Sequence, residues 1–227
     1  MIVRIVEIFH SIQGEGQFAG TPSVFVRTTG CNLRCWFCDS KYTSWHPEGY
    51  HKTWKTVFER VKQFDCQHVV VTGGEPMLQP DVVPLTLALA EVGKFVTVET
   101  AATVFRPVHS DLMSVSPKLT NSTPQLGQWS ERHNRLRDNP EVVRRLIGEY
   151  SYQLKFVIDR REDVDEVQNY LARFANATSD HVWLMPQAIN ADQLMRKTEW
   201  LKLEADRLGY HVSPRLQIEQ FGNVRGK

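Results

Sequence analysis

The stretch His68-Val69-Val70-Val71-Thr72-Gly73-Gly74-Glu75-Pro76 decides the fold, because a β-branched run that stops at two glycines predicts a buried strand and a tight turn. A helix is predicted next over residues 82–92, which begins after Pro80-Asp81 and ends at Gly93. A second strand-like run follows at residues 94–99. A strand, a helix and a strand in this order predict a βαβ unit with parallel strands.

The rest of the chain repeats this alternation. Further strands are predicted at residues 2–9, 23–28, 111–115, 153–158, 181–185 and 211–218, and further helices at 54–64, 161–174 and 191–208. The pattern predicts an α/β fold with mostly parallel strands, in which ligands bind at the carboxyl ends of the strands. We expect one domain over residues 1–227, with an inserted polar loop at about 120–150 that carries one helix over 141–147.

The bulk composition is that of an ordinary globular protein and argues against several classes of function. The chain has 227 residues and a formal net charge of +1, so no strong field favours nucleic acid or a membrane surface. No apolar run approaches the roughly 20 residues that span a bilayer. The first ten residues carry early charges and no small-residue cleavage site, so we expect no signal peptide and a cytoplasmic location.

Cysteine usage indicates a metal centre. The chain has four cysteines, three of which lie within the stretch Gly30-Cys31-Asn32-Leu33-Arg34-Cys35-Trp36-Phe37-Cys38-Asp39. Thiols clustered in this way are typical of metal ligands rather than of a disulfide framework. Three thiolates can hold a [4Fe–4S] cluster and leave one iron open, because full ligation by protein needs a fourth thiolate. An open iron can bind a cofactor or a substrate directly.

A zinc site is the simpler alternative for these thiols. Zinc usually takes four ligands in paired knuckles or with histidines at fixed offsets, and the nearest histidines, His46 and His51, do not follow such a pattern. Cys66 could serve as a fourth ligand, but a single cysteine beside a strand is more typical of a buried structural thiol. The spacing therefore favours a three-thiolate cluster.

The cysteine spacing, with an aromatic residue directly before Cys38, resembles the radical S-adenosylmethionine superfamily. In that superfamily the open iron is chelated by the amino and carboxylate groups of S-adenosylmethionine. One electron from the cluster then releases a 5′-deoxyadenosyl radical, which abstracts hydrogen from the substrate. The resemblance implies a partial (β/α) barrel, and the turn over residues 72–76 is a second superfamily feature.

The amino-terminal part narrows the resemblance to one family. Glu7-Ile8-Phe9-His10-Ser11-Ile12-Gln13-Gly14-Glu15-Gly16, together with Cys38-Asp39-Ser40, is similar to the 7-carboxy-7-deazaguanine synthase family of queuosine-precursor biosynthesis. Weaker matches continue through Glu99-Thr100, residues 114–118 and residues 154–157. In that family 6-carboxy-5,6,7,8-tetrahydropterin undergoes radical ring contraction with loss of ammonia. The family requires magnesium and regenerates S-adenosylmethionine.

The resemblance also implies roles for individual residues. The cluster ligands are Cys31, Cys35 and Cys38, and the magnesium ligand is Ser40. The positions that hold S-adenosylmethionine are Phe37, Cys38, Asp39, Gly74, Ser116, Pro117 and Lys118. The substrate-binding positions are Ile12, Gln13, Gly14, Arg27 and Thr72. Simpler interpretations stay open: Arg27 as a surface cation, Ser40 as a turn cap, and Lys155 as either solvated or paired with carboxylates.

The expected partners follow from the same resemblance. They are a pterin substrate, a flavodoxin-like or ferredoxin-like electron donor and a second copy of the chain, with no nucleic acid and no membrane. Two other functions stay open, a radical activase that installs a glycyl radical on a partner protein and a non-catalytic iron–sulfur electron carrier. The carboxy-terminal residues 214–223 lack the histidine of the family, and Met185-Pro186-Gln187 replaces a usual Leu-Gln-Pro, which leaves substrate contacts there undecided.

Overall fold

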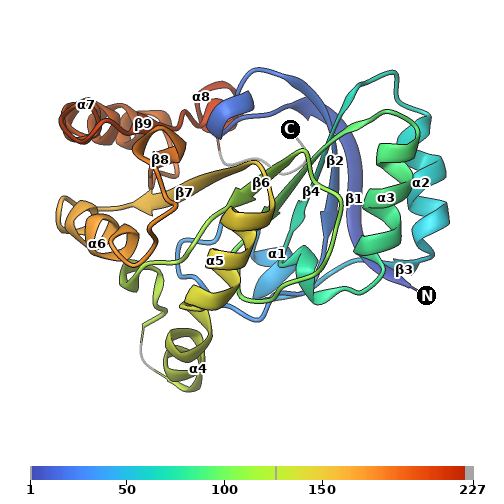
Figure 1. Ribbon diagram of the computed structural model, residues 1–227, viewed down its shortest axis with the longest axis horizontal. Helices are drawn as coiled ribbons and strands as arrows, with labels where there is room; N and C mark the ends of the chain where they lie inside the picture. The colour runs from blue at the N-terminus through green and yellow to red at the C-terminus, as the bar shows by residue number, and fades with distance from the viewer. Residues whose placement is uncertain (1, 126, 223–227) are drawn as a thin grey trace.

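The computed structural model describes residues 2–125 and 127–222. These residues form one nine-stranded sheet and the helices and loops around it (Figure 1). The strands are β1 (Val3–Ile12), β2 (Pro22–Thr28), β3 (Tyr50–Lys52), β4 (His68–Gly73), β5 (Phe95–Thr100), β6 (Leu112–Val115), β7 (Tyr152–Ile158), β8 (Val182–Pro186) and β9 (His211–Val212). Their order is β3-β1-β2-β4-β5-β6-β7-β8-β9. β1 pairs antiparallel with β2 and β3, and every pair from β2 to β9 is parallel. The sheet ends at β3 and β9 without closing, which confirms the partial barrel.

The described residues form eight helices, several of which cover the outer face of the sheet (Figure 1). They are α1 (Lys41–Ser44), α2 (Trp54–Lys62), α3 (Val82–Glu91), α4 (Gln128–Arg137), α5 (Pro140–Glu149), α6 (Glu162–Leu171), α7 (Ala191–Leu208) and α8 (Leu216–Phe221). Short 3-10 turns lie at η1 (Gly16–Phe18), η2 (Pro76–Leu78), η3 (Thr120–Ser122) and η4 (Ser179–His181). Side chains of Thr53, Asn139 and Asn190 accept backbone N–H groups at the starts of α2, α5 and α7, as strong capping residues do.

The two faces of the sheet differ in chemistry because side chains alternate along each strand. Outward-facing positions are apolar and fully buried against the helices, as Val71 and Phe156 illustrate. Inward-facing positions toward the carboxyl ends of the strands are polar, as Thr72, Glu99 and Lys155 illustrate. The barrel therefore has a dry outer core and a polar interior at one end.

Two glycines at the end of β4, Gly73 and Gly74, allow the turn to pack against the end of β2 and the start of the cysteine loop, residues 30–39. A Cβ atom on Gly73 would lie 2.1 Å from the Thr28 carbonyl oxygen, and one on Gly74 would lie 2.2 Å from the Gly30 carbonyl oxygen. The Gly74 amide donates to Thr28 O at 3.1 Å, and the Glu75 amide donates to Gly30 O at 2.9 Å. These glycines are required for contact between two backbones, in addition to any contact with a ligand.

Two predicted segments were wrong in detail. The predicted strand 211–218 is a strand only at β9, because Pro214 cannot donate to a ladder and α8 begins at Leu216. Residues 120–150 carry two helices rather than one. In α5, Val143, Leu146 and Ile147 join the core between β6 and β7. The unpredicted α4 is polar and buries His133 alone, so it has no apolar period from which to predict it.

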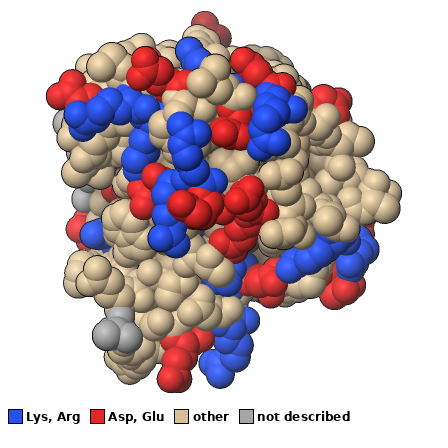
Figure 2. Space-filling view, turned by 90° about the vertical axis from the view of Figure 1, so that its left-hand side faces the viewer, with Lys and Arg blue, Asp and Glu red and all other residues tan. Residues whose placement is uncertain are grey.

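The surface carries both signs of charge. Figure 2 shows Lys and Arg side chains interspersed with Asp and Glu on the face that includes α6 and α7, in keeping with the net charge of +1. Among the residues described, no helix is both long and apolar enough to cross a bilayer.

Candidate active site

A cavity of about 470 Å³ lies inside the open barrel, at the carboxyl ends of the parallel strands. It is lined by nearly all of the site residues predicted from sequence: Ile12, Gln13, Gly14, Arg27, Cys31, Cys35, Phe37, Cys38, Asp39, Ser40, Thr72, Gly74, Ser116 and Lys118. Pro117 is the one predicted position that does not line it. The fold thus brings the amino-terminal loop, the cysteine loop and the ends of β2, β4 and β6 to one place.

The three clustered cysteines line one side of this cavity. Burial raises the pKa of the Cys31 and Cys35 thiols to about 12, so as free thiols they hold their protons at neutral pH. The positive charge of Lys118 acts against burial and on its own would lower the pKa of the Cys31, Cys35 and Cys38 thiols. Lys118 Nζ also donates to Ser116 O at 2.7 Å. Cys66 lies before the first residue of β4, at the far end of the strand, where its thiol donates to Pro22 O at 3.3 Å.

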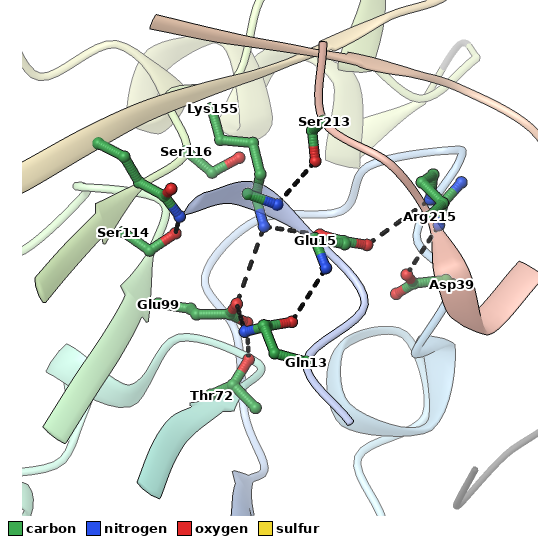
Figure 3. Close-up of polar contacts among 12 residues, drawn as sticks. Gln13, Glu15, Asp39, Thr72, Glu99, Ser114, Ser116, Lys155, Ser213 and Arg215 are labelled. Carbon is green, nitrogen blue, oxygen red and sulfur yellow. Dashed lines mark hydrogen bonds and ion pairs between the residues drawn. The ribbon is translucent and has the colours of Figure 1, made fainter. Parts of the chain in front are cut away.

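A buried ion pair joins β7 to the amino-terminal loop (Figure 3). Lys155 Nζ lies 2.6 Å from Glu15 Oε2 and 3.8 Å from Glu99 Oε1. Burial alone would raise the pKa of Glu15, but Lys155 and Arg215 overcome it and lower the pKa to about 2. Burial would likewise lower the pKa of Lys155, but Glu15 and Glu99 raise it to about 12. Of the two interpretations of Lys155, pairing with carboxylates is the correct one.

The Glu99 carboxylate accepts hydrogen bonds from neighbouring polar side chains of the cavity (Figure 3). Thr72 Oγ1 donates to Glu99 Oε2 at 2.6 Å, and Gln13 Nε2 donates to Glu99 Oε1 at 3.2 Å. The Gln13 side-chain oxygen accepts the Glu15 amide at 3.2 Å. A carboxylate held in this way is an acceptor for the N–H groups of a flat heterocycle.

Arg27 lies in the cavity wall and is not a surface cation. Its side chain is 18 % exposed, and its Nε atom lies 2.8 Å from Glu7 Oε1. A second guanidinium nitrogen donates to Ser40 Oγ at 3.2 Å, and the group lies over the Phe9 ring. The guanidinium is thus held in place by a carboxylate behind it while it faces the cavity.

Ser40 stands at the start of α1, but its hydroxyl does not cap that helix. Ser40 Oγ donates to Asp39 Oδ1 at 3.0 Å and accepts from Arg27. The alternative of a turn cap is therefore wrong. Two hard oxygen groups, the hydroxyl and the neighbouring carboxylate, lie together at the cavity edge.

The carboxy-terminal segment covers the amino-terminal loop. Arg215 is 5 % exposed, donates to Ala188 O at 2.7 Å and lies 3.3 Å from Asp39 Oδ2 and 3.6 Å from Glu15 Oε1. Gln217 Nε2 donates to Glu15 Oε1 at 2.7 Å. A Cβ atom on Gly14 would lie 1.9 Å from the Gln217 side-chain oxygen, so only glycine fits there without displacing that side chain. Arg215 and Gln217 also line the cavity.

Comparison with known proteins decides the family. The model of the Radical SAM superfamily matches residues 25–121. A 7-carboxy-7-deazaguanine synthase of Rhodopirellula baltica is 42% identical over 98% of this chain and 88% of its own length. One of Halobacterium salinarum is 42% identical over 97% of this chain and 91% of its own length. The chain belongs to the 7-carboxy-7-deazaguanine synthase family.

Solved structures agree at the level of the fold. The crystal structure of QueE from Escherichia coli superposes with a TM-score of 0.67 over 93% of each chain, at 23% identity. Streptococcus suis SuiB gives a TM-score of 0.58 over 83% of this chain and 47% of its own. The Radical SAM model and the named relatives show that this member of the 7-carboxy-7-deazaguanine synthase family is a radical S-adenosylmethionine enzyme and a lyase. Its superfamily implies a [4Fe–4S] cluster and S-adenosylmethionine, and three thiols beside one lysine in a single cavity fit such a cluster.

Sequence reasoning assigned no role to several cavity residues of this family member. They are Glu15, Glu99, Lys155, Arg215 and Gln217. A usable signal was present in β7, where Gln153 and Lys155 alternate with buried Leu154 and Phe156 and thereby mark a polar inner face. Nothing local marks Arg215 or Gln217, which reach the cavity only because α8 folds back over the loop that contains Gly14.

Proposed function

We propose that this member of the 7-carboxy-7-deazaguanine synthase family converts 6-carboxy-5,6,7,8-tetrahydropterin to 7-carboxy-7-deazaguanine with loss of ammonia. The observation that carries the proposal is the run of alternating charges Glu99, Lys155 and Glu15 in the cavity that also contains three clustered thiols. The pyrimidine ring of this substrate carries N–H donors and its carbon 6 carries a carboxylate, so the substrate needs both an acceptor and a cation. The names of the relatives identify the product class, and the cavity supplies matching chemistry.

The cofactors are assigned to one side of the cavity. Cys31, Cys35 and Cys38 hold the cluster, and the S-adenosylmethionine positions are Phe37, Asp39, Gly74 and the Ser116-Pro117-Lys118 turn. When bound, the cluster and S-adenosylmethionine supply the radical that abstracts hydrogen from substrate. Because the thiols are buried and protonated, they must lose protons as the cluster is loaded. Lys118 offsets part of the negative charge that results.

The substrate is assigned to the part of the cavity that contains Glu99 and Arg27. Glu99, oriented by Thr72 and Gln13, accepts N–H groups of the pterin ring, and backbone groups at Ile12 and Gly14 border the ring. Arg27 clamps the substrate carboxylate, with Glu7 holding the guanidinium from behind. In this arrangement both polar ends of the substrate are fixed before hydrogen is removed from carbon 6.

Magnesium is assigned to Ser40. The Ser40 hydroxyl and the Asp39 carboxylate are hard oxygen groups of the kind that magnesium binds, and the cation needs only one or two ligands from protein when substrate and water supply the rest. Arg27 now donates to the same hydroxyl, so metal binding releases that guanidinium toward the substrate carboxylate. Substrate and metal are therefore expected to bind together.

An electron donor of the flavodoxin or ferredoxin type, assembly into a homodimer and a cytoplasmic location complete the proposal. The donor and the dimer rest on the family resemblance, and the location rests on the cysteine usage. Light scattering on the loaded protein tests the dimer, and reduction of the cluster by added flavodoxin tests the donor.

The decisive experiment is anaerobic incubation of the loaded protein with carboxytetrahydropterin, S-adenosylmethionine, magnesium and dithionite, followed by mass spectrometry. We expect 7-carboxy-7-deazaguanine, with S-adenosylmethionine conserved. Glu99→Gln should keep the cluster and S-adenosylmethionine binding but lose the product. Turnover that is indifferent to magnesium would favour the radical activase, and failure to cleave S-adenosylmethionine on reduction would favour the electron carrier.

A further inference from the structure

The cysteine loop is held from outside by the segment that follows Lys118. The Arg34 backbone amide donates to His133 Nδ1 at 3.1 Å, and the Trp36 amide donates to Ser122 O at 3.2 Å. The Trp36 indole nitrogen donates to Asn121 O at 2.7 Å. Arg34 and Trp36 are the two neighbours of Cys35, so these bonds fix the backbone on both sides of one thiol.

His133 is neutral and carries its proton on Nε2. The Arg34 amide requires an acceptor at Nδ1, and the Ser122 hydroxyl gives its own hydrogen to Leu119 O at 2.6 Å. Ser122 Oγ is therefore free to accept from His133 Nε2 at 2.9 Å, which assigns the tautomer through the hydrogen-bond network. His133 is 1% exposed, and burial, with Arg137 and Lys118 nearby, lowers its pKa to about 4.

The segment that holds the loop is itself anchored to the barrel. The Thr120 amide donates to Glu166 of α6 at 2.8 Å, and Asn121 Nδ2 donates to Asp163 at 2.7 Å. Asp163 is buried, and its carboxylate also accepts the amides of Asp159 and Arg160 at the end of β7. A continuous chain of hydrogen bonds thus runs from the end of β7, through η3 and His133, to the backbone beside Cys35.

We propose that His133 is a positioning residue for the iron–sulfur cluster, because it fixes the cysteine loop relative to η3 and, through η3, to the end of β7. This gives a role to α4, the helix that composition did not reveal. The inference rests on the proposed ligation by Cys31, Cys35 and Cys38. His133 does not line the active-site cavity, so its direct link to the cysteine loop is the Arg34 amide.

The acceptor at Nδ1 is the critical atom. Without it, the Arg34 N–H loses its partner beside Cys35, where the sulfur atoms of a cluster held by Cys35 would offer it new acceptors. Hydrogen bonds to cluster sulfur make the reduction potential less negative, so a freed amide changes a property that loosened packing alone does not.

Two substitutions of similar shape distinguish the roles of the two imidazole nitrogens. His133→Asn keeps an acceptor at the position of Nδ1 and loses the donor to Ser122. His133→Gln keeps a donor at the position of Nε2 and loses the acceptor for Arg34. Ser122→Ala removes the Nε2 partner alone. Asn134→Ala is the matched control, since Asn134 is the next residue of α4 and bonds Thr123 and Arg137 but not the cysteine loop.

The measurements are the rate of cluster loss to a chelator, the reduction potential of the cluster, and the unfolding temperature of each cluster-free chain. We expect His133→Gln to lose its cluster about tenfold faster and to show a less negative potential, because the Arg34 N–H beside Cys35 has lost its acceptor. His133→Asn, Ser122→Ala and Asn134→Ala should stay within about twofold of wild type, as expected for an intact Arg34 bond.

Equal behaviour of the Gln and Asn variants, or rates that simply follow the unfolding temperatures, would overturn the proposal. If His133→Gln fails to load a cluster, the Asn variant decides: wild-type loading supports the role of the Nδ1 acceptor, and failure refutes it. Cys35→Ala and Cys66→Ala run in parallel. If the three clustered cysteines are not the cluster ligands, these two variants will show it, independently of His133.

Discussion

Lys155 Nζ lies 2.6 Å from Glu15 Oε2 across 140 positions of sequence, in the active-site cavity, with the Lys155 side chain 5% and the Glu15 side chain 14% exposed. Glu15 has an ordinary pKa of 4.5 and a folded-state pKa of about 2. Its contribution to stability is therefore fully present above pH 4.5 and is lost as the pH falls toward 2.

Glu15→Gln should make the free energy of unfolding less dependent on pH between pH 5 and pH 2. Between pH 5 and pH 2 the wild-type free energy of unfolding should fall by on the order of 3 kcal/mol more than that of the variant. At pH 7 the variant should already be less stable by about 3 kcal/mol, because the Lys155 charge stays buried without its nearest partner. Urea unfolding at several pH values measures both, and Glu162→Gln in an exposed ion pair is the control, expected within about 0.5 kcal/mol. Parallel curves for wild type and Glu15→Gln would contradict the coupling.

Each clustered cysteine should be essential for the cluster. Cys31→Ala, Cys35→Ala and Cys38→Ala should each abolish the brown absorbance, because the remaining two thiolates cannot hold the cubane. Cys66→Ala should leave it nearly intact, since Cys66 lies at the opposite end of β4. Absorbance and iron content after anaerobic reconstitution measure this, and loss of the cluster in Cys66→Ala with retention in Cys38→Ala would show that the ligand set is wrong.

Ser40→Ala should keep the cluster and S-adenosylmethionine binding but lose the stimulation of turnover by magnesium. Loss of the metal misplaces the substrate, and a displacement of about 1 Å can reduce a rate roughly 100-fold. Ser40→Thr should respond to magnesium as wild type does, because the hydroxyl is retained. A normal magnesium response in Ser40→Ala would place the metal elsewhere.

Arg27→Ala should weaken substrate binding, because a charge-assisted bond contributes about 1.5–3 kcal/mol, or roughly 10- to 150-fold in KM. Arg27→Lys should recover only part of this loss, since an ammonium group cannot form two parallel bonds to a carboxylate. The free energy of unfolding should be followed as well, because Glu7 loses an ion-pair partner. Wild-type kinetics in Arg27→Ala would rule out the carboxylate clamp.

Gly74→Ala should prevent assembly of the cysteine loop. Its Cβ atom would lie 2.2 Å from the Gly30 carbonyl oxygen, and backbone on both sides leaves no flexible atom to move. We expect a loss of stability of about 2 kcal/mol or more and poor cluster loading. Gly148→Ala in α5 is the matched control, because nothing lies within 4 Å of its added methyl group. That variant should gain about 0.5–1 kcal/mol, and equal thermal unfolding of the two would contradict this explanation.

The sequence by itself determined the features that depend on near neighbours. Three thiols within eight residues predicted the metal loop, and the alternation around residues 68–99 predicted the parallel sheet and placed the cavity at its carboxyl ends. Both signals are local, since ligand spacing and side-chain periodicity are fixed by the residues that adjoin them.

Only the tertiary structure decided which distant groups meet. Lys155 could be solvated or paired until the fold brought the loop that contains Glu15 across the open barrel to β7. The helix α4 has almost no apolar face, and its position depends on bonds from His133 to Arg34 and Ser122. The helix α8 begins where the Leu216 amide donates to Gly14 O, 202 positions away in the chain. Contacts of this kind cannot be predicted from the sequence pattern of either segment. Each bond forms only after the whole fold has brought the two segments together.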